Sequence, residues 1–207
     1  MEDPTELVGT HVRLERLDRR HVGPLVEAGR DGTAFYDWSF VPQGEESMRH
    51  YVEQALSLAA GGRAVPFATV RQRDGAVIGT TRFFDLERWA WPAERRARAD
   101  AAFDTGEIGY TWLSPAAIRT AANTEAKLLM LAHAFERWGM RAVTFHTDAR
   151  NARSRAAIER IGGRFEGILR SHRLAVDYQP RDSARYSIVE SEWPRVKEHL
   201  TGLLARG

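Results

Sequence analysis

Residues 107–170 restrict the possible folds more than any other part of the chain. An alternating, strand-like run at 107–113 leads through a polar loop to a helix expected over 123–138, and a second strand at 141–147 leads to a helix that begins at Asn151. A helix N-terminus presents unpaired N–H groups and the positive end of a dipole, which attract phosphate and other anions. Two strands that each lead into a helix N-terminus therefore predict an anion-binding cofactor site.

The remaining pattern predicts one mixed α/β domain over residues 1–207. The Asp74-Gly75 pair between two alternating runs is typical of a tight hairpin, and Gly79 inside the second run indicates a bulge or a close backbone approach. The elements expected outside the central stretch are strands at 11–17, 65–72, 76–85, 164–173 and 183–190, helices at 19–30, 45–60 and 192–204, and a loop at 174–182.

Composition excludes several classes of protein. The chain has 207 residues, 43% of them hydrophobic, which is enough for a substantial core. It has no cysteine, so disulfides, thiolate metal sites and a cysteine nucleophile are excluded. No apolar run approaches the ~20 residues that span a bilayer, and the acidic first residues lack a signal-peptide pattern. We therefore expect a cytoplasmic protein without a membrane partner.

Arginine supplies nearly all of the positive charge. Lys127 and Lys197 are the only lysines among 30 basic residues, and the net charge is +2. The arginines could simply occupy solvated faces, or they could line a groove for an acidic partner such as nucleic acid. Glu94 and Asp100 flank the densest basic run, 95–98, which favours the solvated faces.

Local motifs of other common enzyme classes are missing. The chain contains no Gly-x-Gly-x-x-Gly, Gly-x-x-x-x-Gly-Lys-Ser/Thr, His-Glu-x-x-His or Gly-x-Ser-x-Gly sequence. Its seven histidines are scattered, with none four residues from another. We therefore expect no metal site.

Motifs in a fixed order carry a resemblance to a known family. The central strand, loop, helix and strand are followed by Asn151-Ala-Arg-Ser154 and by Gly162-Gly-Arg-Phe-Glu-Gly167. The likeness extends through Arg181-Asp-Ser-Ala-Arg-Tyr-Ser187 and Glu192-Trp-Pro194, and back to Gly9-Thr-His-Val-Arg-Leu-Glu15. Over nearly its whole length the chain resembles the GNAT acetyltransferases, and within them the RimJ/RimL type, which includes the ribosomal-protein N-terminal acetyltransferases.

The resemblance implies both a fold and an activity. The fold is a mixed α/β GNAT fold, a mostly antiparallel mixed sheet of about seven strands that splays between the fourth and fifth strands and is flanked by helices. The activity is acetyl-CoA-dependent N-acetyl transfer to a primary amine, by direct transfer in a ternary complex and without a metal. The acceptor could be a small molecule or a protein N-terminus, and the protein could be a monomer or a homodimer.

The strand at 107–113 is implied to hold the thioester. In the family a bulge splays this strand from the next and frees backbone N–H groups, one of which binds the thioester carbonyl. Tyr110, Thr111 and Trp112 are the candidate main-chain donors, and Gly109 suits the local distortion.

The catalytic residues implied by the resemblance are Glu107 and Ser154. Glu107 is the candidate general base for the acceptor ammonium, although it could instead form a salt bridge with an arginine. Ser154 would act as a general acid near the CoA sulfur, and Asn151 would bind the acetyl-CoA arm; both are also common helix caps. His146 and Asp148 are second-line bases.

The phosphate loop departs from the family pattern of Gln/Arg-x-x-Gly-x-Gly/Ala. Ile118 stands at the first position, Ala121 replaces the glycine and Asn123 takes the last position. Backbone amides can still bind a pyrophosphate with alanine there if φ stays negative. Asn123 or Thr124 could also cap the helix, and Lys127 and His133 are expected to be surface or packing residues. The candidate cofactor-binding residues of the loop are Arg119, Thr120, Ala121, Ala122, Asn123 and Thr124.

Two loops without a recognisable motif, 33–44 and 86–105, are the candidates for selecting the acceptor, with core or surface packing as the alternative. Two other functions remain open at this stage. A CoA-sensing regulatory module would keep the cofactor cleft without needing Glu107 as a base. An RNA- or ribosome-binding protein would lose affinity steeply with salt.

Overall fold

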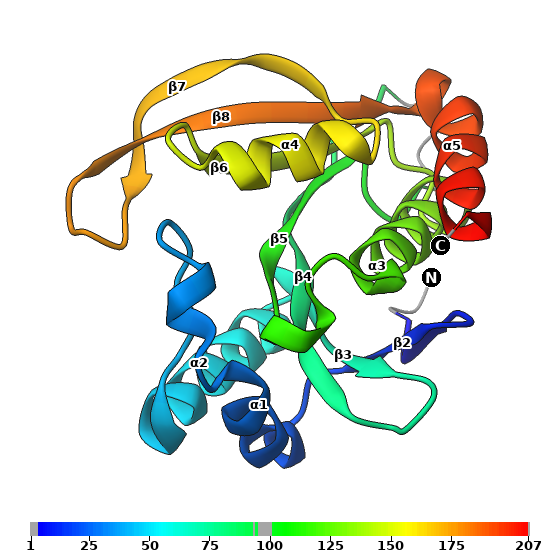
Figure 1. Cartoon of the computed structure of the whole chain (residues 1–207). Helices are drawn as coiled ribbons and strands as arrows, with labels where there is room; N and C mark the ends of the chain where they lie inside the picture. Colours follow the sequence, from blue (N-terminus) through cyan, green and yellow to red (C-terminus); the bar gives the residue numbers. More distant parts are fainter. Residues whose placement is uncertain (1–3, 93, 95–100, 207) are drawn as a thin grey trace.

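The fold is built on an eight-stranded mixed sheet (Figure 1). The structure is a computed structural model that describes residues 4–92, 94 and 101–206. The strands lie in the order β1-β2-β3-β4-β5-β6-β8-β7, and every neighbouring pair is antiparallel except β5 and β6. Their bounds are β1 Glu6–Val8, β2 Val12–Arg16, β3 Ala64–Arg71, β4 Val77–Glu87, β5 Thr105–Leu113, β6 Ala142–Asp148, β7 Arg164–Leu174 and β8 Pro180–Val189.

The expected mostly antiparallel mixed sheet is confirmed, with eight strands instead of about seven. The additional strand is β1, which pairs with β2 at the edge of the sheet. Its three residues are too few to show a period. The splay therefore falls between the fifth and sixth strands, β5 and β6.

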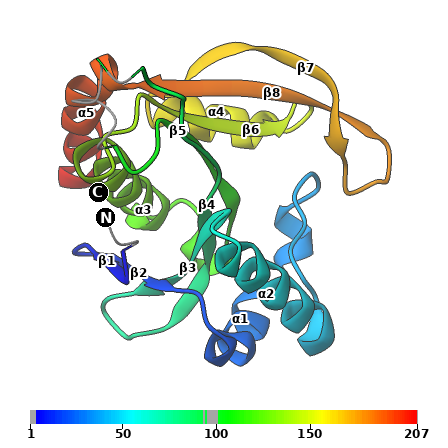
Figure 2. The ribbon, with the colours of Figure 1, turned by 180° about the vertical axis from the view of Figure 1, so that it is seen from behind.

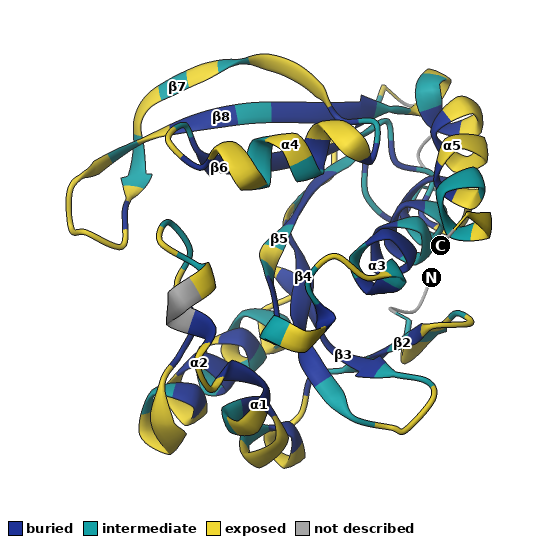
Figure 3. Ribbon diagram, in the orientation of Figure 1, coloured by how far each residue is buried: buried dark blue, intermediate teal, exposed yellow. Residues whose placement is uncertain are grey.

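Helices cover both faces of the sheet. Their bounds are α1 Val22–Gly29, α2 Gly44–Ala60, α3 Ala121–Ala132, α4 Ala152–Arg160 and α5 Trp193–Ala205. Two hydrophobic clusters separate the faces: α1 and α2 pack with Ala68 of β3, whereas α3 and α5 pack with its neighbour Phe67. Successive strand residues point to opposite faces, so the sheet carries a core on each side, as the dark-blue interior of Figure 3 and the two opposed views of Figures 1 and 2 show.

Several element boundaries differ from the expected ones. The helix expected at 123–138 begins at Ala121 and continues past Ala132 as a π-helical turn to Arg137. The helix expected at 19–30 begins with a 3-10 turn before α1. The expected loop at 174–182 is shorter, because β7 extends to Leu174 and β8 starts at Pro180.

The hairpin of β3 and β4 positions the strand that carries the site. Gly79 has φ +154°, and a Cβ built on it would lie 2.0 Å from the carbonyl oxygen of Trp112. This is the close backbone approach that the sequence predicts, and a register shift lies next to it. Only glycine lets β4 pack this closely against β5.

Candidate active site

A cleft opens where β5 and β6 separate. The two parallel strands pair at only three positions, Thr105↔Ala142, Gly106↔Val143 and Glu107↔Thr144, and then diverge. The resulting cleft has a volume of about 730 Å³ and is lined by the 33–44 loop, α2, β4, β5, the 117–120 loop, α3, β6, α4 and the β7–β8 hairpin. This volume lies within the usual range of ligand-binding sites.

The bulge that frees β5 is centred on Tyr110. Thr80 pairs with Trp112 and Arg82 with Gly109, so β5 has one more residue than β4 across this step. Tyr110 has φ +50°, whereas Gly109 is not in a left-handed conformation. The distortion expected at Gly109 therefore falls one residue later.

The three candidate backbone donors of β5 present different side chains. Tyr110 is half exposed, and Trp112 is 2% exposed and packs in the core beneath α2. Thr111 bonds through Oγ1 to Thr81 Oγ1 at 2.8 Å. The indole of Trp112 thus stabilises the fold, and any role of this residue in the cleft belongs to its main chain.

Glu107 lies buried at the base of the cleft and is held by Arg173. The Arg173 Nη2 group donates to Glu107 Oε2 at 2.9 Å and to Asp85 Oδ2 at 3.1 Å. His146 Nδ1 also lies 2.9 Å from Oε2, though without hydrogen-bond geometry. Among the described residues both contacts fall on Oε2, so Oε1 is left for another donor. The expected salt bridge is present, and it does not consume the oxygen that a base would use.

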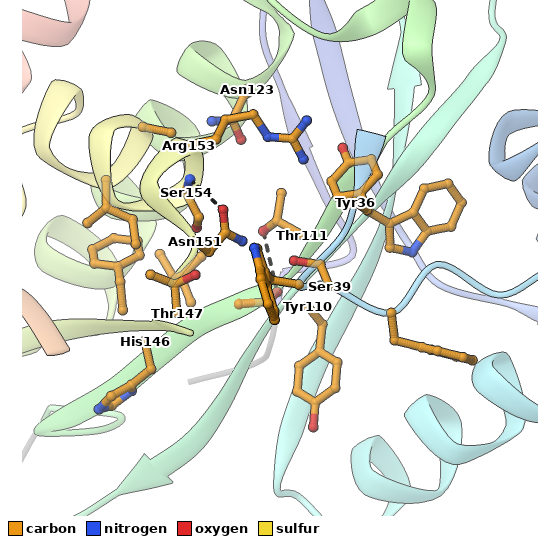
Figure 4. A pocket seen from close by; sticks show the side chains of 18 of the residues that line it. Tyr36, Ser39, Tyr110, Thr111, Asn123, His146, Thr147, Asn151, Arg153 and Ser154 are labelled. Atoms are coloured by element: carbon orange, nitrogen blue, oxygen red, sulfur yellow. Dashed lines mark hydrogen bonds between the residues drawn. The ribbon is translucent and has the colours of Figure 1, made fainter. Parts of the chain in front are cut away.

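Asn151 and Ser154 lie together at the start of α4. Asn151 Oδ1 caps the helix by accepting from the Ser154 backbone N–H at 3.0 Å. In Figure 4 these two residues stand on one side of the pocket and Tyr36 and Ser39 on the other, with Thr111 between them. The expected Asn-x-x-Ser arrangement is therefore present, and its Asn oxygen is already engaged by its own helix.

The two second-line bases have structural contacts. Asp148 pairs with Arg150, which holds the pKa of that carboxyl below its usual range, and also accepts from the Arg150 backbone. His146 borders Glu107 and packs against the ring of His172 at 4.9 Å. Burial is the main reason why the pKa of His172 is lowered.

The 33–44 loop forms the wall opposite α4. The Tyr36 hydroxyl donates to the Leu113 carbonyl at 3.1 Å and accepts from the Leu113 N–H at 2.9 Å, so this loop is tied to the end of β5. Arg150 lies 3.9 Å over the ring of Trp38 and also pairs with Asp177 beyond the end of β7. None of the described residues of 86–105 lines the cleft, so the expectation that this loop covers the acceptor site is wrong for that part; 93 and 95–100 lie outside the described residues.

Comparison with known proteins identifies the family to which this fold and cleft belong. Residues 11–164 match the family described as the acetyltransferase (GNAT) domain. The chain belongs to the GNAT acetyltransferases. It is thus a GNAT-family N-acetyltransferase.

Similar solved structures cover almost the whole of this GNAT chain. A GCN5-related N-acetyltransferase from Brucella melitensis shares 27% identity, with a TM-score of 0.82 over 98% of this chain and 86% of the other. An acetyltransferase structure from T. thermophilus shares 31% identity, with a TM-score of 0.76 over 99% of both chains. The Mycobacterium smegmatis RimJ complex with CoA-disulfide shares 21%, with a TM-score of 0.75 over 93% and 88%, which shows the fold alone. Comparison with curated proteins gave no match.

GNAT acetyltransferases use acetyl-CoA, and the start of α3 fits an anionic group of that kind. Thr120 is the N-cap and accepts from Ala122 N–H at 3.2 Å, while the other N–H groups of a first turn have no partner within the helix. Asn123 Oδ1 lies buried at this end of the cleft without a hydrogen-bond partner among the described residues. The cap expected at Asn123 or Thr124 is therefore wrong, and Asn123 is left with an acceptor atom for a ligand.

The structure also places the other residues of the expected phosphate loop. Arg119 has φ +61°, so the left-handed residue is Arg119 and not Ala121, which already lies in the helix. Thr124 accepts from Arg160 of α4 at 2.8 Å. Glu125 accepts from the backbone N–H groups of Thr10, His11 and Val12 at 2.6–2.8 Å, which ties α3 to the start of β2.

Of the two places expected for Lys127, at the surface or in packing, the structure excludes the surface. This lysine is buried and lines the cleft, and its ammonium donates to Thr111 Oγ1 at 2.9 Å and to Thr81 Oγ1 at 3.3 Å. Burial without an acidic partner lowers its pKa to about 7. The available signal was a lysine within an apolar helical stretch of a chain that otherwise uses arginine.

None of the described helices of this chain is long and apolar enough to cross a membrane. Within 4–92, 94 and 101–206, no three His, Cys, Asp or Glu side chains are grouped so that they could hold a metal ion.

Proposed function

We propose that this enzyme transfers the acetyl group of acetyl-CoA to a primary amine, within a ternary complex and without a covalent enzyme intermediate. The observation that carries the proposal is the position of Glu107 at the base of a cleft whose far end is the N-terminus of α3. A buried carboxylate with one unengaged oxygen suits an ammonium acceptor, and a free helix N-terminus suits a pyrophosphate.

The cofactor end would be held mostly by the chain's backbone. Acetyl-CoA supplies an acetyl thioester, whose carbonyl carbon is the electrophile. The N–H groups of 120–124 and the Arg119 charge would bind the pyrophosphate, and Asn123 Oδ1 would accept from a donor of the cofactor. Asn151 would offer its side-chain amide to the pantetheine arm. The backbone of Tyr110, Thr111 and Trp112 would supply the N–H for the thioester oxygen, which is worth about 3–4 kcal/mol when such a donor is correctly aimed.

The acceptor end would be organised by Glu107. Its Oε2 is fixed by Arg173, which holds the carboxylate in place, and Oε1 would accept a proton from the acceptor ammonium. The neutral amine nitrogen would form the new N–C bond while the C–S bond breaks. Ser154, which lines the cleft, would give its proton to the departing sulfur and take up the second proton of the acetylated nitrogen, which thereby becomes a neutral amide. The sulfur leaves readily as a thiol of pKa about 8.5.

The RimJ/RimL type is the branch we propose for this enzyme. Support comes from solved structures of the M. smegmatis RimJ complex and of a Vibrio cholerae protein described as a ribosomal-protein-serine acetyltransferase, at 21% and 15% identity. At these identities the likeness of both structures supports a shared fold only. The acceptor in this proposal is therefore any primary amine of a small molecule or of a protein N-terminus.

The first test is calorimetric titration with acetyl-CoA, followed by thiol release with a panel of amines. We expect micromolar binding and turnover with at least one amine. Glu107→Gln keeps the shape and should leave the acetyl-CoA Kd within about twofold, yet lower kcat by about 100-fold or more, the usual contribution of a general base.

Two outcomes would overturn the proposal. Absence of heat at millimolar acetyl-CoA, together with no rise in Tm, would show that the cleft does not bind acetyl-CoA. Turnover of Glu107→Gln at the wild-type rate would show that Glu107 is not the general base and that the acceptor loses its proton by another route.

A further inference from the structure

The charged residues that line the cleft are strongly unbalanced. Glu107 is the only acidic residue among its described lining residues, and it faces six basic ones: Arg119, Lys127, Arg153, Arg160, Arg173 and Arg181. Under the proposed function, the phosphates of CoA balance the charges near the N-terminus of α3. The positive charge on the β7–β8 side, away from that end, needs another partner.

Arg181 of β8 is the unbalanced group on that side. Its Nε donates to Ser183 Oγ at 2.9 Å, and no carboxylate of a described residue lies within salt-bridge distance of it. It is half buried. Burial, together with the nearby positive charge of Arg173, lowers the pKa of Arg181 below its ordinary value. A desolvated guanidinium with a single hydroxyl partner is costly unless an anion binds it.

The acidic groups in the neighbourhood are already committed to other arginines. Glu107 and Asp85 pair with Arg173, and Asp148 pairs with Arg150. Arg173 and Arg181 are register partners on β7 and β8, so two like charges face each other across the hairpin, an arrangement that destabilises a sheet. The chain keeps an arginine at this position although it weakens the hairpin, which points to a ligand.

We infer that the acceptor is an amine that also carries a carboxylate, and that Arg181 binds this carboxylate. The inference rests on the proposed amine acetylation and specifies its substrate class. A guanidinium binds a carboxylate with two parallel hydrogen bonds, so Arg181 determines both orientation and specificity.

The spacing favours a short molecule such as an amino acid. Arg173 connects the proposed base to Arg181: its guanidinium bonds to Glu107, and its backbone is the register partner of Arg181 on the neighbouring strand. An ammonium on Glu107 Oε1 and a carboxylate on Arg181 therefore belong to groups a few bonds apart. Tyr36 and Trp38 on the opposite wall offer aromatic surface for a side chain. Polyamines are disfavoured, since their extra positive charges would meet an excess of arginine.

The test compares matched acceptors at saturating acetyl-CoA. L-phenylalanine, L-leucine and L-glutamate are each compared with their C-terminal amides by thiol release. We expect the acids to exceed the amides in kcat/KM by about tenfold or more, since a site built for a polar group rejects the analogue that lacks it. Arg181→Gln should lower kcat/KM for the acids by about tenfold, mainly through KM, and leave the amides within about twofold.

Two further variants separate recognition from folding. Arg181→Lys keeps a point charge without the forked geometry and should recover only part of the preference for acids. Arg170 on β7 is exposed and lies outside the cleft, so Arg170→Gln should change neither substrate series. An unchanged Kd for acetyl-CoA in each variant shows that the cleft has formed.

The results of these experiments distinguish failure of the carboxylate inference from failure of the proposed acetyl transfer. Equal use of acids and amides, or an equal loss for both in Arg181→Gln, overturns the inference while acetyl transfer itself stands. Absence of turnover with every amine and of acetyl-CoA binding overturns the proposed function and this inference with it. A preference for peptides with an acidic residue next to the N-terminus over the matching amide-bearing peptides, lost in Arg181→Gln, supports carboxylate binding with a polypeptide as its source.

Discussion

The α3 side of the cleft and its base hold buried charge in different ways. On the α3 wall, Lys127 is buried with only the hydroxyls of Thr81 and Thr111 as partners, and its pKa falls to about 7. At the base of the cleft, Glu107 is equally buried but pairs with Arg173. Burial without a counter-charge favours the neutral form of a lysine, whereas a buried ion pair is stable only while both partners are present. The Lys127 site should therefore respond to pH, and the Glu107–Arg173 pair to loss of a partner.

The largest expected effect is the pH dependence of Lys127→Met. The folded pKa of about 7 lies below the ordinary 10.5, so the folded state binds fewer protons than the unfolded state between these values. The free energy of unfolding of the wild type should then rise with pH between about 7 and about 10.5. Below pH 7 it should level off, because the buried Lys127 is then charged and the cost of burying that charge is fully present. Methionine does not titrate, so Lys127→Met lacks this contribution to the pH dependence. The advantage of the variant in free energy of unfolding should shrink by about 4 kcal/mol between about pH 6 and about pH 10.

Lys197 provides the control for this experiment. It is the only other lysine, and it lies half exposed on α5 with its ammonium 2.8 Å from Glu136. Urea unfolding of the wild type, Lys127→Met and Lys197→Met across the pH range isolates the Lys127 slope. NMR of lysine labelled at Cε gives the titration directly, because only two signals are present. Parallel pH profiles for wild type and Lys127→Met would show that Lys127 stays charged when folded.

The next effect is the cost of removing Arg173. Arg173→Gln leaves Glu107 buried without its arginine, and we expect a loss of about 2–3 kcal/mol, at the low end for a broken buried pair because Arg173 is partly exposed. In Arg173→Gln/Glu107→Gln no buried unpaired carboxylate remains, because Asp85, the other partner of Arg173, is exposed. The double variant should therefore be more stable than the sum of the two single effects predicts, by about 1 kcal/mol.

A double-mutant cycle in urea measures this coupling between Arg173 and Glu107. Additive losses from the two single variants would mean that Glu107 is stabilised mainly by other contacts, such as His146. Arg170→Gln, an exposed arginine on the same strand, sets the size of a loss that does not involve the cleft.

The fold follows from sequence patterns that are local or nearly so. The Asp74-Gly75 pair and the alternating runs around it predict the β3–β4 hairpin, and the apolar stripe predicts α3. The short β1 strand escapes prediction because three edge residues show no period. The α3 cap escapes it because Thr120, Asn123 and Thr124 are all good caps. Only the left-handed turn at Arg119 decides between them, and that turn depends on the packing of the preceding segment.

The site is predictable where roles belong to motifs and unpredictable where they depend on distant contacts. Asn151, Ser154 and Glu107 line the cleft as expected from their motif and strand positions. Arg173 meets Glu107 across 66 residues of chain, and only the folded β7–β8 hairpin brings them together. Arg181 is one of many arginines in the sequence, and nothing local marks it as the unbalanced one. The role of such residues follows from the partners that the folded chain gives them or withholds.

The smallest effect concerns the position that the family pattern assigns to glycine. Ala121 lies in the first turn of α3 with negative φ, so Ala121→Gly adds backbone freedom without relieving strain. We expect a loss below about 1 kcal/mol, a Tm decrease of about 1–3 °C, and no gain in acetyl-CoA affinity. Arg119→Gly is the matched variant, because φ is +61° there. It should not lower stability, since glycine tolerates that conformation, but it should weaken acetyl-CoA binding by removing a charge. Tighter acetyl-CoA binding by Ala121→Gly would instead show that the missing glycine limits the cofactor end, and that the alanine at 121 does restrict the backbone N–H groups of the α3 terminus.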